Sequence, residues 1–270
     1  MKKPKVKIMG VLNVTPDSFS DGGNFSTLDK ALAQADRLVD AGADIIDIGG
    51  ESTRPFSEPV PVKKEMQRVI PVIAAIRKKH TVPISIDTTK ALVAEAALGS
   101  GADIINDISA LRKDPNMIAL VRKTDVPVII MHMKGSPSNM QVKPEYDDVM
   151  AEIMTFFQER IEKITACGIK KDRLIIDPGI GFGKTLQHNL TLLKELHRFS
   201  EFGLPVLLGH SRKRFLGDIT GVDSEEKRDT ATAVVSALCS RKNIDIIRVH
   251  NVAATREALL VAEAVMADPA

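Results

Sequence analysis

Short apolar runs rich in isoleucine and valine alternate along the chain with longer stretches in which apolar residues recur at helical spacing. The first pattern predicts buried β-strands and the second predicts amphipathic helices. The predicted strands are Lys7–Asn13, Asp44–Gly49, Pro83–Asp87, Ile104–Ile108, Val128–Met131, Leu174–Asp177, Val206–Gly209 and Asp245–Val249. The predicted helices include Leu28–Ala41, Val62–His80, Lys90–Gly99, Tyr146–Cys167, Leu186–Phe199, Ser224–Arg241 and Ala253–Ala267.

Strands that alternate with helices predict a parallel sheet. Eight such units, with no linker or low-complexity break, predict a single α/β domain over residues 1–270, a closed (β/α)₈ TIM barrel. Residues 41–49 and 100–108 share the segment Gly-Ala-Asp-Ile-Ile, as repeated βα units would. An open doubly wound sheet is the alternative, but it usually carries Gly-x-Gly-x-x-Gly after the first strand, and this chain does not.

The overall charge does not favour a nucleic-acid partner. Lysine and arginine number 37 and aspartate and glutamate 35, for a net charge of +2, and the chain has no tryptophan and one tyrosine for base stacking. The basic start is followed by an apolar run too short for a signal peptide, and no later segment is long enough to span a membrane, so we expect a cytoplasmic protein with no membrane partner. Cys167 and Cys239 lie in predicted helices without metal-ligand spacing and are expected to be buried thiols.

A carboxylate followed by a glycine-rich turn ends the sixth predicted strand. Asp177 precedes Pro178, which cannot donate to a strand ladder, and three alternate glycines follow at Gly179, Gly181 and Gly183. Glycines let the backbone fold tightly against whatever Asp177 holds. The turn is not a nucleotide-phosphate loop, because only three residues separate Gly179 from Gly183 and that loop requires four.

Polar residues end almost every predicted strand, and in a barrel these ends meet at one mouth where the chemistry takes place. Any one of them could be a helix cap or a turn residue, but the whole set is not explained in that way. Asp47 lies between isoleucines, so we expect it to be a buried structural partner. The strand-end residues are Asn13, Asp47, Glu51, Asp87, Asn106, His132, Asp177, His210–Lys213 and Arg248–Asn251.

Asp87, Asn106 and Asp177 come from the middle strands and offer mainly hydrogen-bond acceptors. Such a set suits a flat heterocycle with several N–H groups. The sequence therefore predicts a ring-binding pocket at the centre of the mouth.

Asn13, Lys213, Arg248 and His250 come from the first, seventh and eighth strands, which become neighbours when the barrel closes. Phosphate sites favour this arc in TIM barrels, so we expect an anion site to one side of the ring. The chain has no His-x-His or His-Glu-x-x-His pattern, which argues against a transition-metal hydrolase, and Mg²⁺ carried by the substrate fits oxygen ligands better.

Long connections rich in glycine, proline and serine follow the first two strands. Thr15–Gly23 and Gly49–Pro55 are expected to cover the mouth and to be mobile before a substrate arrives. His132–Glu145 is a third long loop, to which we assign no role.

The motifs together are similar to those of dihydropteroate synthase, in the family's order, from the first predicted strand to the last. The resemblance implies a (β/α)₈ barrel that is usually a homodimer. It implies a pterin-binding transferase of folate biosynthesis and a sulfonamide target, which condenses 6-hydroxymethyl-7,8-dihydropterin pyrophosphate with para-aminobenzoate to give 7,8-dihydropteroate and pyrophosphate. The matching motifs are Asn13–Gly23, Gly49–Pro55, Asp87-Thr88, Asn106–Ser109, Asp177–Lys184, Ser211–Lys213 and Arg248–Asn251.

The resemblance also implies which residues bind each part of the reacting pair. It assigns the pterin ring to Asp87, Asn106, Asp177, Lys213 and Arg248. It assigns Mg²⁺, the expected cofactor, to Asn13 and the pyrophosphate to Arg248 and His250. It implies an aminobenzoate site formed by Phe19, Thr53, Arg54, Pro55, Phe182 and Ser211–Lys213. The chain departs from some members by carrying Arg214, where they have serine.

This resemblance implies a mechanism in which Asp87, Lys213, Arg248 and His250 take part in catalysis. Mg²⁺, Arg248 and His250 would neutralise the departing pyrophosphate, while Asp87 and Asp177 would stabilise a cationic carbon conjugated with the ring. Two other functions stay open: a pterin-binding barrel that transfers a methyl group to a corrinoid, and an inactive pterin-binding or scaffold subunit.

Overall fold

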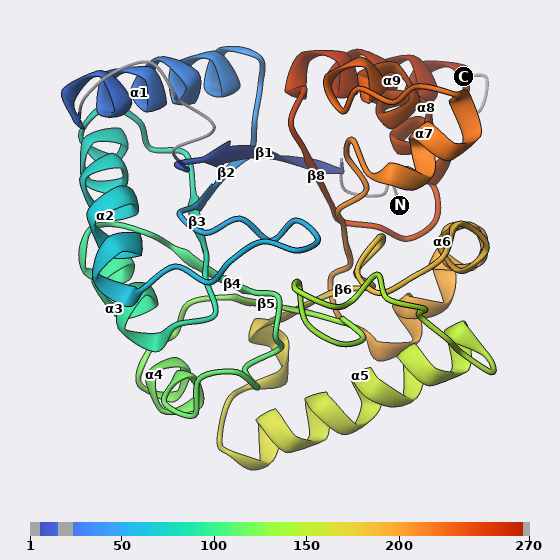
Figure 1. Ribbon diagram of the computed structural model, residues 1–270, viewed down its shortest axis with the longest axis horizontal. Helices are drawn as coiled ribbons and strands as arrows, with labels where there is room; N and C mark the ends of the chain where they lie inside the picture. The colour runs from blue at the N-terminus through green and yellow to red at the C-terminus, as the bar shows by residue number, and fades with distance from the viewer. Residues whose placement is uncertain (1–5, 16–23, 267–270) are drawn as a thin grey trace.

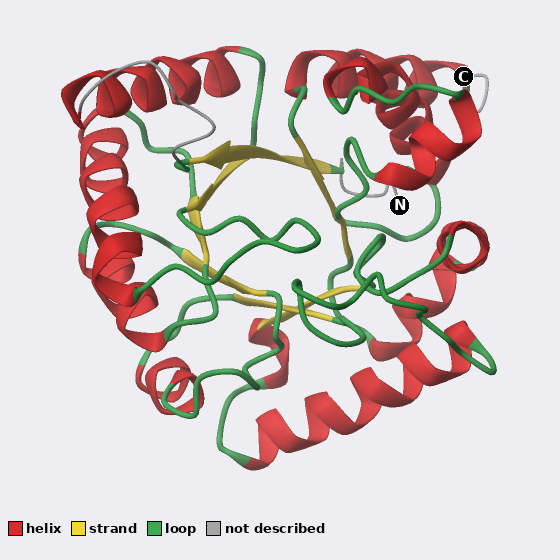
Figure 2. Ribbon diagram, viewed as in Figure 1, coloured by secondary structure: helices red, strands yellow, loops and turns green. Residues whose placement is uncertain are grey.

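The structure is a computed structural model that describes residues 6–15 and 24–266. Within these residues eight parallel strands form one sheet in the order β6-β5-β4-β3-β2-β1-β8-β7, and a parallel bridge between Ile176 and Val206 joins its two ends. Figure 2 shows the strands as a ring with helices around it, which confirms the predicted (β/α)₈ barrel. The strands are β1 (Lys7–Asn13), β2 (Ile45–Gly49), β3 (Ile84–Asp87), β4 (Ile104–Asp107), β5 (Val128–Met131), β6 (Leu174–Asp177), β7 (Leu207–Leu208) and β8 (Ile246–Val249).

The helices follow the strands in the alternation that the sequence predicts (Figure 1). The α-helices are α1 (Asn24–Asp40), α2 (Val62–Lys79), α3 (Ala91–Gly99), α4 (Met117–Lys123), α5 (Val149–Ala166), α6 (Leu186–Lys194), α7 (Arg214–Thr220), α8 (Asp229–Cys239) and α9 (Val252–Val265). Short 3₁₀ helices cover Lys171–Arg173, Leu196–Phe202 and Glu226–Arg228. The predicted ranges did not include the short helices α4 and α7.

Local hydrogen bonds explain where the helix boundaries differ from the predictions. The carboxylate of Asp148 accepts from the backbone N–H groups of Met150 and Ala151, so α5 begins at Val149 and not at Tyr146. The predicted helix Leu186–Phe199 divides into α6 and the tighter 3₁₀ helix that follows it.

Two apolar layers hold the barrel together. The larger one lies between the sheet and the surrounding helices and includes Ile46, Ile86, Phe157 and Phe199. A smaller cluster consists of inward-facing residues from seven strands, and it fills the barrel below the mouth. Its members are Met9, Ile45, Ile104, Ile129, Ile175, Leu207 and Ile246.

Cys239 is buried, as predicted, but Cys167 is exposed at the end of α5, so the prediction of two buried thiols is wrong for Cys167. Cys167 caps the helix just before Gly168 and therefore lies beyond the face that packs on the core. Among the described residues, no helix is both long enough and apolar enough to cross a membrane.

Candidate active site

The inward-facing apolar cluster determines which polar side chains enter the mouth. Side chains two positions apart on a strand point to the same face. The residues two positions after Ile45, Ile104, Ile175 and Ile246 therefore form the next layer toward the mouth. These residues are Asp47, Asn106, Asp177 and Arg248.

Arg248 joins the acidic residues at the centre of this layer. Its Nε donates to Oδ2 of Asp47 across 2.6 Å, and its Nη2 donates to Oδ2 of Asp87 across 2.9 Å. The amide nitrogen of Asn106 lies 3.3 Å from both carboxylate oxygens of Asp47. Asp47 is completely buried, which confirms that it is a structural partner. The expected separation of an acidic centre from a cationic rim is wrong for Arg248, because two buried carboxylates hold its guanidinium.

Burial and close ion pairs shift the pKa values of the charged groups at this centre. Burial, and then the neighbouring charge of Asp47, raises the pKa of Asp87 to about 7, although Arg248 opposes the shift. Burial disfavours the charged form of Arg248, but Asp47 and Asp87 outweigh it and raise the pKa of the guanidinium. Asp87 can therefore gain or lose a proton near neutral pH beside a permanent cation.

The glycine-rich turn after β6 folds back on Asp177, as predicted. The backbone N–H of Gly179 donates to Oδ1 of Asp177 across 2.8 Å, and Gly179, Gly181 and Gly183 all have positive φ. A Cβ on Gly179 would lie 1.9 Å from the carbonyl oxygen of His132, so no other residue fits there. Burial raises the pKa of Asp177 to about 6, although the Gly179 hydrogen bond and Lys213 oppose it.

Lys184 stabilises this turn from inside and binds no phosphate. It is buried, and its ammonium donates to the carbonyl oxygens of Gly179 and Phe182 across 2.8 and 3.0 Å. The same ammonium lies 3.1 Å from Nδ1 of His132. Lys184 therefore donates its hydrogen bonds to carbonyl groups of the turn, whereas the lysine of a nucleotide-phosphate loop donates to its ligand.

Lys213 lies above the same turn. Its Nζ is 3.7 Å from the centroid of the Phe182 ring, a cation–π contact. A Cβ on Gly181 would lie 2.8 Å from Cδ of Lys213, so the lysine stem packs directly on the turn. Burial lowers the pKa of Lys213 to about 7, although Asp177 opposes the shift. The structure thus brings Asp177, Phe182 and Lys213 together, as predicted.

Ser211 and His250 form a second polar pair beside Arg248. Oγ of Ser211 lies 3.0 Å from Nδ1 of His250 and also accepts from the backbone N–H of His250. Burial, followed by the charges of Arg248 and Arg212, lowers the pKa of His250 to about 3. Burial and the two guanidinium groups therefore favour the neutral imidazole, and the predicted contact of His250 with the pyrophosphate stays a prediction.

Asn13 ends β1 beside Gly49 and is partly buried. A Cβ on Gly49 would lie 3.7 Å from Oδ1 of Asn13 and 3.6 Å from Cβ of Asp87, which places the amide beside the acidic centre. Among the described residues, no group of three or more histidine, cysteine, aspartate or glutamate residues could hold a metal ion. Asn13 would offer one neutral oxygen to a Mg²⁺ ion at this place.

The loop between β2 and α2 carries Thr53, Arg54 and Pro55. Figure 1 shows this loop running across the ring of strands. Thr53 is half-buried, whereas Arg54 and Pro55 are exposed, and Arg54 forms an ion pair with Glu225 across 2.8 Å. Phe19 and most of the loop Thr15–Gly23 lie outside the described residues, so the prediction for Phe19 stays untested.

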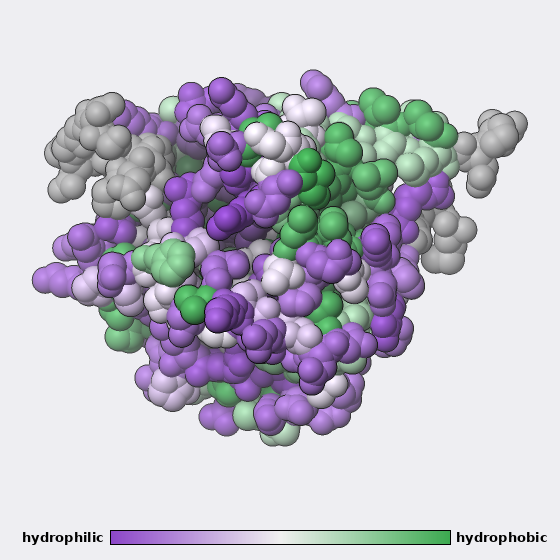
Figure 3. Space-filling view, turned by 45° about the vertical axis from the view of Figure 1, so that its right-hand side comes forward, coloured by the Kyte–Doolittle hydropathy of each residue, from purple (hydrophilic) through white to green (hydrophobic). Residues whose placement is uncertain are grey.

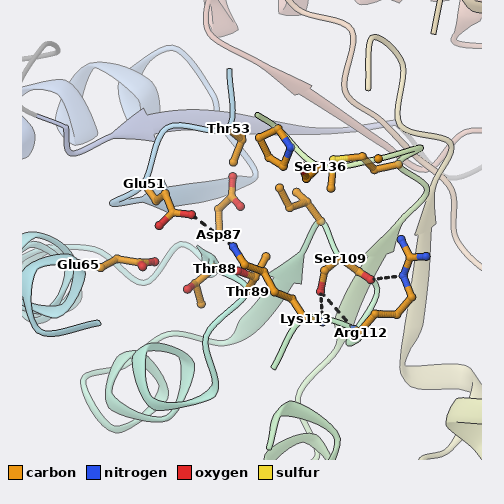
Figure 4. A pocket seen from close by; sticks show the side chains of 14 residues that line it. Glu51, Thr53, Glu65, Asp87, Thr88, Thr89, Ser109, Arg112, Lys113 and Ser136 are labelled. Carbon is orange, nitrogen blue, oxygen red and sulfur yellow. Dashed lines mark hydrogen bonds and ion pairs between the residues drawn. The ribbon is translucent and has the colours of Figure 1, made fainter. Parts of the chain in front are cut away.

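A cavity of about 360 Å³ lies under this loop, on the side of the mouth formed by β3 and β4 (Figure 4). Among the described residues of the predicted site, only Thr53 and Asp87 line it. Its lining residues are Glu51, Thr53, Glu65, Asp87, Thr88, Thr89, Ile108, Ser109, Arg112, Lys113, Met133, Gly135, Ser136 and Pro137.

Three strand-end or neighbouring residues lie away from this centre. His210 is buried and its Nε2 lies 2.9 Å from the carbonyl oxygen of Thr232 in α8, so it stabilises the fold. His132 packs edge-on against Phe156, and burial lowers its pKa to about 2. The side chain of Arg214 is 90% exposed, which directs it to solvent rather than into the pocket.

An apolar wall borders the mouth, and four of its five residues were not among the predicted site residues. Ile108 follows β4, Met131 ends β5, Met133 lies just past β5, and Met140 lies in the long loop beyond it. Apolar residues at such places resemble any other core position, so the sequence gives no signal that separates them. The wall consists of Ile108, Met131, Met133, Met140 and the predicted Phe182.

Comparisons with known proteins show the family of the chain. The model of the family described as pterin binding enzyme matches residues 9–250. The chain is 47% identical over 261 residues to dihydropteroate synthase of Escherichia coli K12, covering 96% of this chain and 91% of that protein. It is 44% identical over 257 residues to the enzyme of Synechocystis, covering 95% and 89%.

Solved structures give the same result. Dihydropteroate synthase of Xanthomonas albilineans with 4-aminobenzoic acid superposes with a TM-score of 0.93 at 47% identity, covering 98% of this chain and 94% of that one. Its complex with 7,8-dihydropteroate superposes with a TM-score of 0.90 at 44% identity, covering 100% and 97%. The Yersinia pestis enzyme in a sulfonamide complex gives 0.91 at 45% identity, covering 97% and 94%. The family model and the relatives match this chain almost end to end, and the chain belongs to the dihydropteroate synthase family.

Proposed function

We infer that this chain catalyses the reaction of its family, the condensation of 6-hydroxymethyl-7,8-dihydropterin pyrophosphate with para-aminobenzoate. The observation that carries this inference is that Asp87, Asn106 and Asp177 lie together with Lys213 and Arg248 at the mouth of the barrel. Relatives of 44–47% identity have structures with 4-aminobenzoic acid and with 7,8-dihydropteroate. These complexes support the same pair of ligands here.

The acidic centre suits the pterin ring. We propose that Asp87, Asn106 and Asp177 pair with the N–H and carbonyl groups along its edge, since carboxylates accept parallel hydrogen bonds from such donors. Arg248 lies against Asp87 and Asp47, where its planar guanidinium can also stack on the ring. The carboxylates would favour positive charge on the ring as the carbon–oxygen bond to pyrophosphate breaks.

Arg248, His250 and Asn13 are proposed to receive the departing pyrophosphate. Arg248 supplies the positive charge, and neutral His250, oriented by Ser211, supplies a hydrogen bond. Asn13 offers an oxygen toward a Mg²⁺ ion carried by the diphosphate. When bound, that ion would offset the negative charge of the leaving group.

The aminobenzoate is proposed to lie against Phe182, Lys213 and Ser211, under a loop that supplies Thr53 and Arg54. Its amine is neutral at pH 7, so the reaction needs a well-placed nucleophile rather than a strong general base. Positioning of this kind converts a bimolecular reaction into an effectively unimolecular one and keeps water away. The proposal accounts for a mouth that brings together no serine–histidine–aspartate triad among its described residues.

A pterin-dependent methyl transferase to a corrinoid is the closer rival. That enzyme could bind a pterin in the same acidic pocket, but its reaction has no pyrophosphate for Arg248, His250 and Asn13 to contact. An inactive scaffold subunit would need none of these residues to converge. Identity to dihydropteroate synthases over almost the whole chain favours the synthase over both.

The test is pyrophosphate release by the purified full-length chain. The assay supplies the dihydropterin pyrophosphate with and without para-aminobenzoate, and with Mg²⁺ or an excess of chelator. We expect release that requires both substrates and Mg²⁺, with equimolar dihydropteroate. Binding of the pterin without any turnover would contradict the proposal and favour the scaffold subunit.

We also propose that the chain forms a homodimer through α8 and α9, which pack against each other. These helices expose several large apolar side chains, and Figure 3 shows hydrophobic surface on this side of the molecule. A patch of this kind on a single chain indicates an association surface, and a second copy would cover it by two-fold symmetry. Val261→Lys should convert the dimer to a monomer in sedimentation experiments, whereas a chain that is monomeric at every concentration would exclude the dimer. The exposed residues are Val234, Leu238, Leu260, Val261 and Val265.

We also propose a cytoplasmic location, as expected from the sequence. Fractionation of cells that produce the chain tests it.

A further inference from the structure

A buried ion cluster ties the loop between β2 and α2 to the start of α3. The ammonium of Lys90 lies 2.5 Å from Oε2 of Glu51 and 2.5 Å from Oε2 of Glu65. Glu65 is completely buried, and the side chains of Lys90 and Glu51 are 15% and 16% exposed. Burial disfavours the charged ammonium, but hydrogen bonds to the two carboxylates outweigh it and raise the pKa of Lys90. Lys90 is therefore a permanent cation that two carboxylates share.

The same cluster closes the base of the loop, residues 50–61. Oε2 of Glu51 also accepts from the backbone N–H of Val60 across 2.8 Å, which joins the two ends of the loop. Arg68 of α2 donates to the carbonyl oxygen of Gly50 across 2.6 Å. The two ends of the loop are thus held together at its base, and the carboxylate of Glu51 lies at the centre of these contacts.

The outer part of the loop has weaker anchors. The Arg54–Glu225 ion pair joins side chains that are 67% and 47% exposed, and such surface pairs contribute little. The backbone N–H of Phe56 also donates to the carbonyl oxygen of Pro137 in a neighbouring loop across 3.0 Å. The position of the loop therefore depends mainly on its base.

Lys90 connects this base to the strand that carries Asp87. Asp87 ends β3, and Lys90 follows three residues later at the start of α3. Glu51 and Thr53 lie two positions apart on the loop, and both line the same cavity as Asp87 and Glu65 (Figure 4). The contact between Glu51 and Lys90 thus sets how far Thr53 lies from Asp87.

We propose that Lys90 is a positioning residue of the active site, which acts through Glu51 to set where Thr53 and Arg54 lie relative to Asp87. Lys90 does not line the cavity, so it acts on the substrate only through the loop. The inference rests on the proposed function, because it takes Thr53 and Arg54 as contacts of the aminobenzoate. A cluster that merely stabilised the fold would change unfolding but not the relative affinities of the two substrates.

The kinetic test compares Lys90→Met and Lys90→Arg in the full-length chain. We expect Lys90→Met to raise KM for para-aminobenzoate about tenfold and to leave pterin affinity within about twofold, because only the loop moves. Lys90→Arg keeps the charge and should recover most of the loss. Lys79→Met is the control and should leave both KM values unchanged, since Lys79 does not line the cavity and its ion pair with Asp36 leaves its side chain 60% exposed. Equal weakening of both substrates in Lys90→Met would overturn the proposal.

Glu51→Gln covers the case in which Lys90→Met does not fold. Loss of Lys90 leaves the buried Glu65 without its cation, whereas Glu51→Gln keeps the Lys90–Glu65 pair intact. It removes only the charge that holds the loop. We expect the same selective rise in KM for para-aminobenzoate, and an unchanged KM would overturn the proposal.

Hydrogen exchange without any substrate separates this inference from the proposed function. The amide of Val60 donates to Glu51, so it should exchange about tenfold faster in Glu51→Gln, while amides of β3 stay unchanged. If the unaltered chain shows no turnover, the synthase assignment fails and the exchange rates still decide whether the cluster holds the loop. Unchanged exchange throughout residues 50–61 would refute the positioning role.

Discussion

Nη2 of Arg248 lies 2.9 Å from Oδ2 of Asp87, although the two residues are 161 positions apart in the chain. The guanidinium also contacts Asp47, which is completely buried and reaches Asn106 as well. Asp47, which is too deeply buried to contact a ligand, thus holds Arg248 and Asn106, two residues of the proposed ring pocket. Side chains fixed in this way need little rearrangement when the substrate binds.

We predict that Asp47→Asn both destabilises the fold and slows the reaction. Removing one partner of a buried ion pair leaves an uncompensated charge, so the free energy of unfolding should fall by about 3 kcal/mol. The value of kcat/KM should fall as well, because Arg248 keeps only Asp87. Urea unfolding and steady-state kinetics measure the two effects.

Glu195→Gln is the matched control for that substitution. It breaks an ion pair with Arg198 in which both side chains are about 40% exposed, so it should cost less than about 1 kcal/mol. Equal losses of unfolding free energy in the two variants would mean that Asp47 does not stabilise the acidic centre.

Pterin affinity should increase as the pH rises from 5.5 to 7.5. The ring pairs with ionised carboxylates, and burial raises the pKa of Asp87 to about 7 and that of Asp177 to about 6. Below these values the carboxyl groups bind protons, which must leave before the ring can pair with them. Binding is therefore favoured above the pKa values and is lost as the pH falls through them.

Calorimetric titration in two buffers of different ionisation enthalpy measures the protons that leave. The titration should use a pterin that does not itself titrate in this range. We expect net proton release near pH 6.5. Constant affinity with no proton release would show that the carboxyl groups are already ionised in the free protein.

Gly181→Ala should weaken catalysis by displacing Lys213. Its φ is +78°, and a Cβ there would lie 2.8 Å from Cδ of Lys213. We expect kcat/KM to fall about tenfold, because small displacements of reacting groups are costly. Gly203→Ala is the control, with φ of +65° and no atom within 4 Å of the added Cβ. Both variants should lose about 1 kcal/mol of stability from backbone strain, and equal kinetic losses would contradict the role of Lys213.

Asp177→Ala should abolish pterin binding. The carboxylate is buried at the centre of the pocket, and the ring has no other acceptor on β6. The substitution also removes the acceptor of the Gly179 N–H group. Asp177→Asn keeps an oxygen at that position and should recover folding but not affinity. Unchanged pterin affinity in Asp177→Ala would count against the assigned pocket.

His250→Ala should mainly slow the departure of pyrophosphate. The imidazole is neutral and offers one hydrogen bond, and loss of such a donor lowers kcat by about 100-fold. Pterin affinity should stay within about threefold, because His250 makes no contact with Asp87, Asn106 or Asp177. Single-turnover measurements of pyrophosphate release test this, and a loss confined to pterin binding would contradict it.

Most of the fold could be predicted from local pattern. Strands and helices differ in hydrophobic period, so the eight strands were placed to within one or two residues of their ends. Boundaries that depend on side-chain capping, such as the start of α5 after Asp148, were less accurate. The short helices α4 and α7 have too few turns to show a period.

Part of the site also followed from sequence. A parallel barrel brings all strand ends to one mouth, and a residue two positions after an inward isoleucine points inward too. Asp87 could be grouped with Asn106 and Asp177 because all three come at the ends of predicted strands. The spacing rule is local and applies directly only to Asn106 and Asp177, since Ser85 precedes Asp87 at that spacing. It does not say whether a side chain just beyond a strand turns inward, and His210 turned toward α8.

The sequence alone determined the eight strands, the longer helices, their order and most of the polar residues that approach the mouth, because hydrophobic period and strand polarity are local properties. Only the tertiary structure decided that Arg248 lies between Asp47 and Asp87, that His250 is neutral, and that Lys90 holds the loop through Glu51. These features depend on distances between residues far apart in the chain and on how deeply each charge is buried. Electrostatic energy follows those two quantities, and neither can be read from the order of residues.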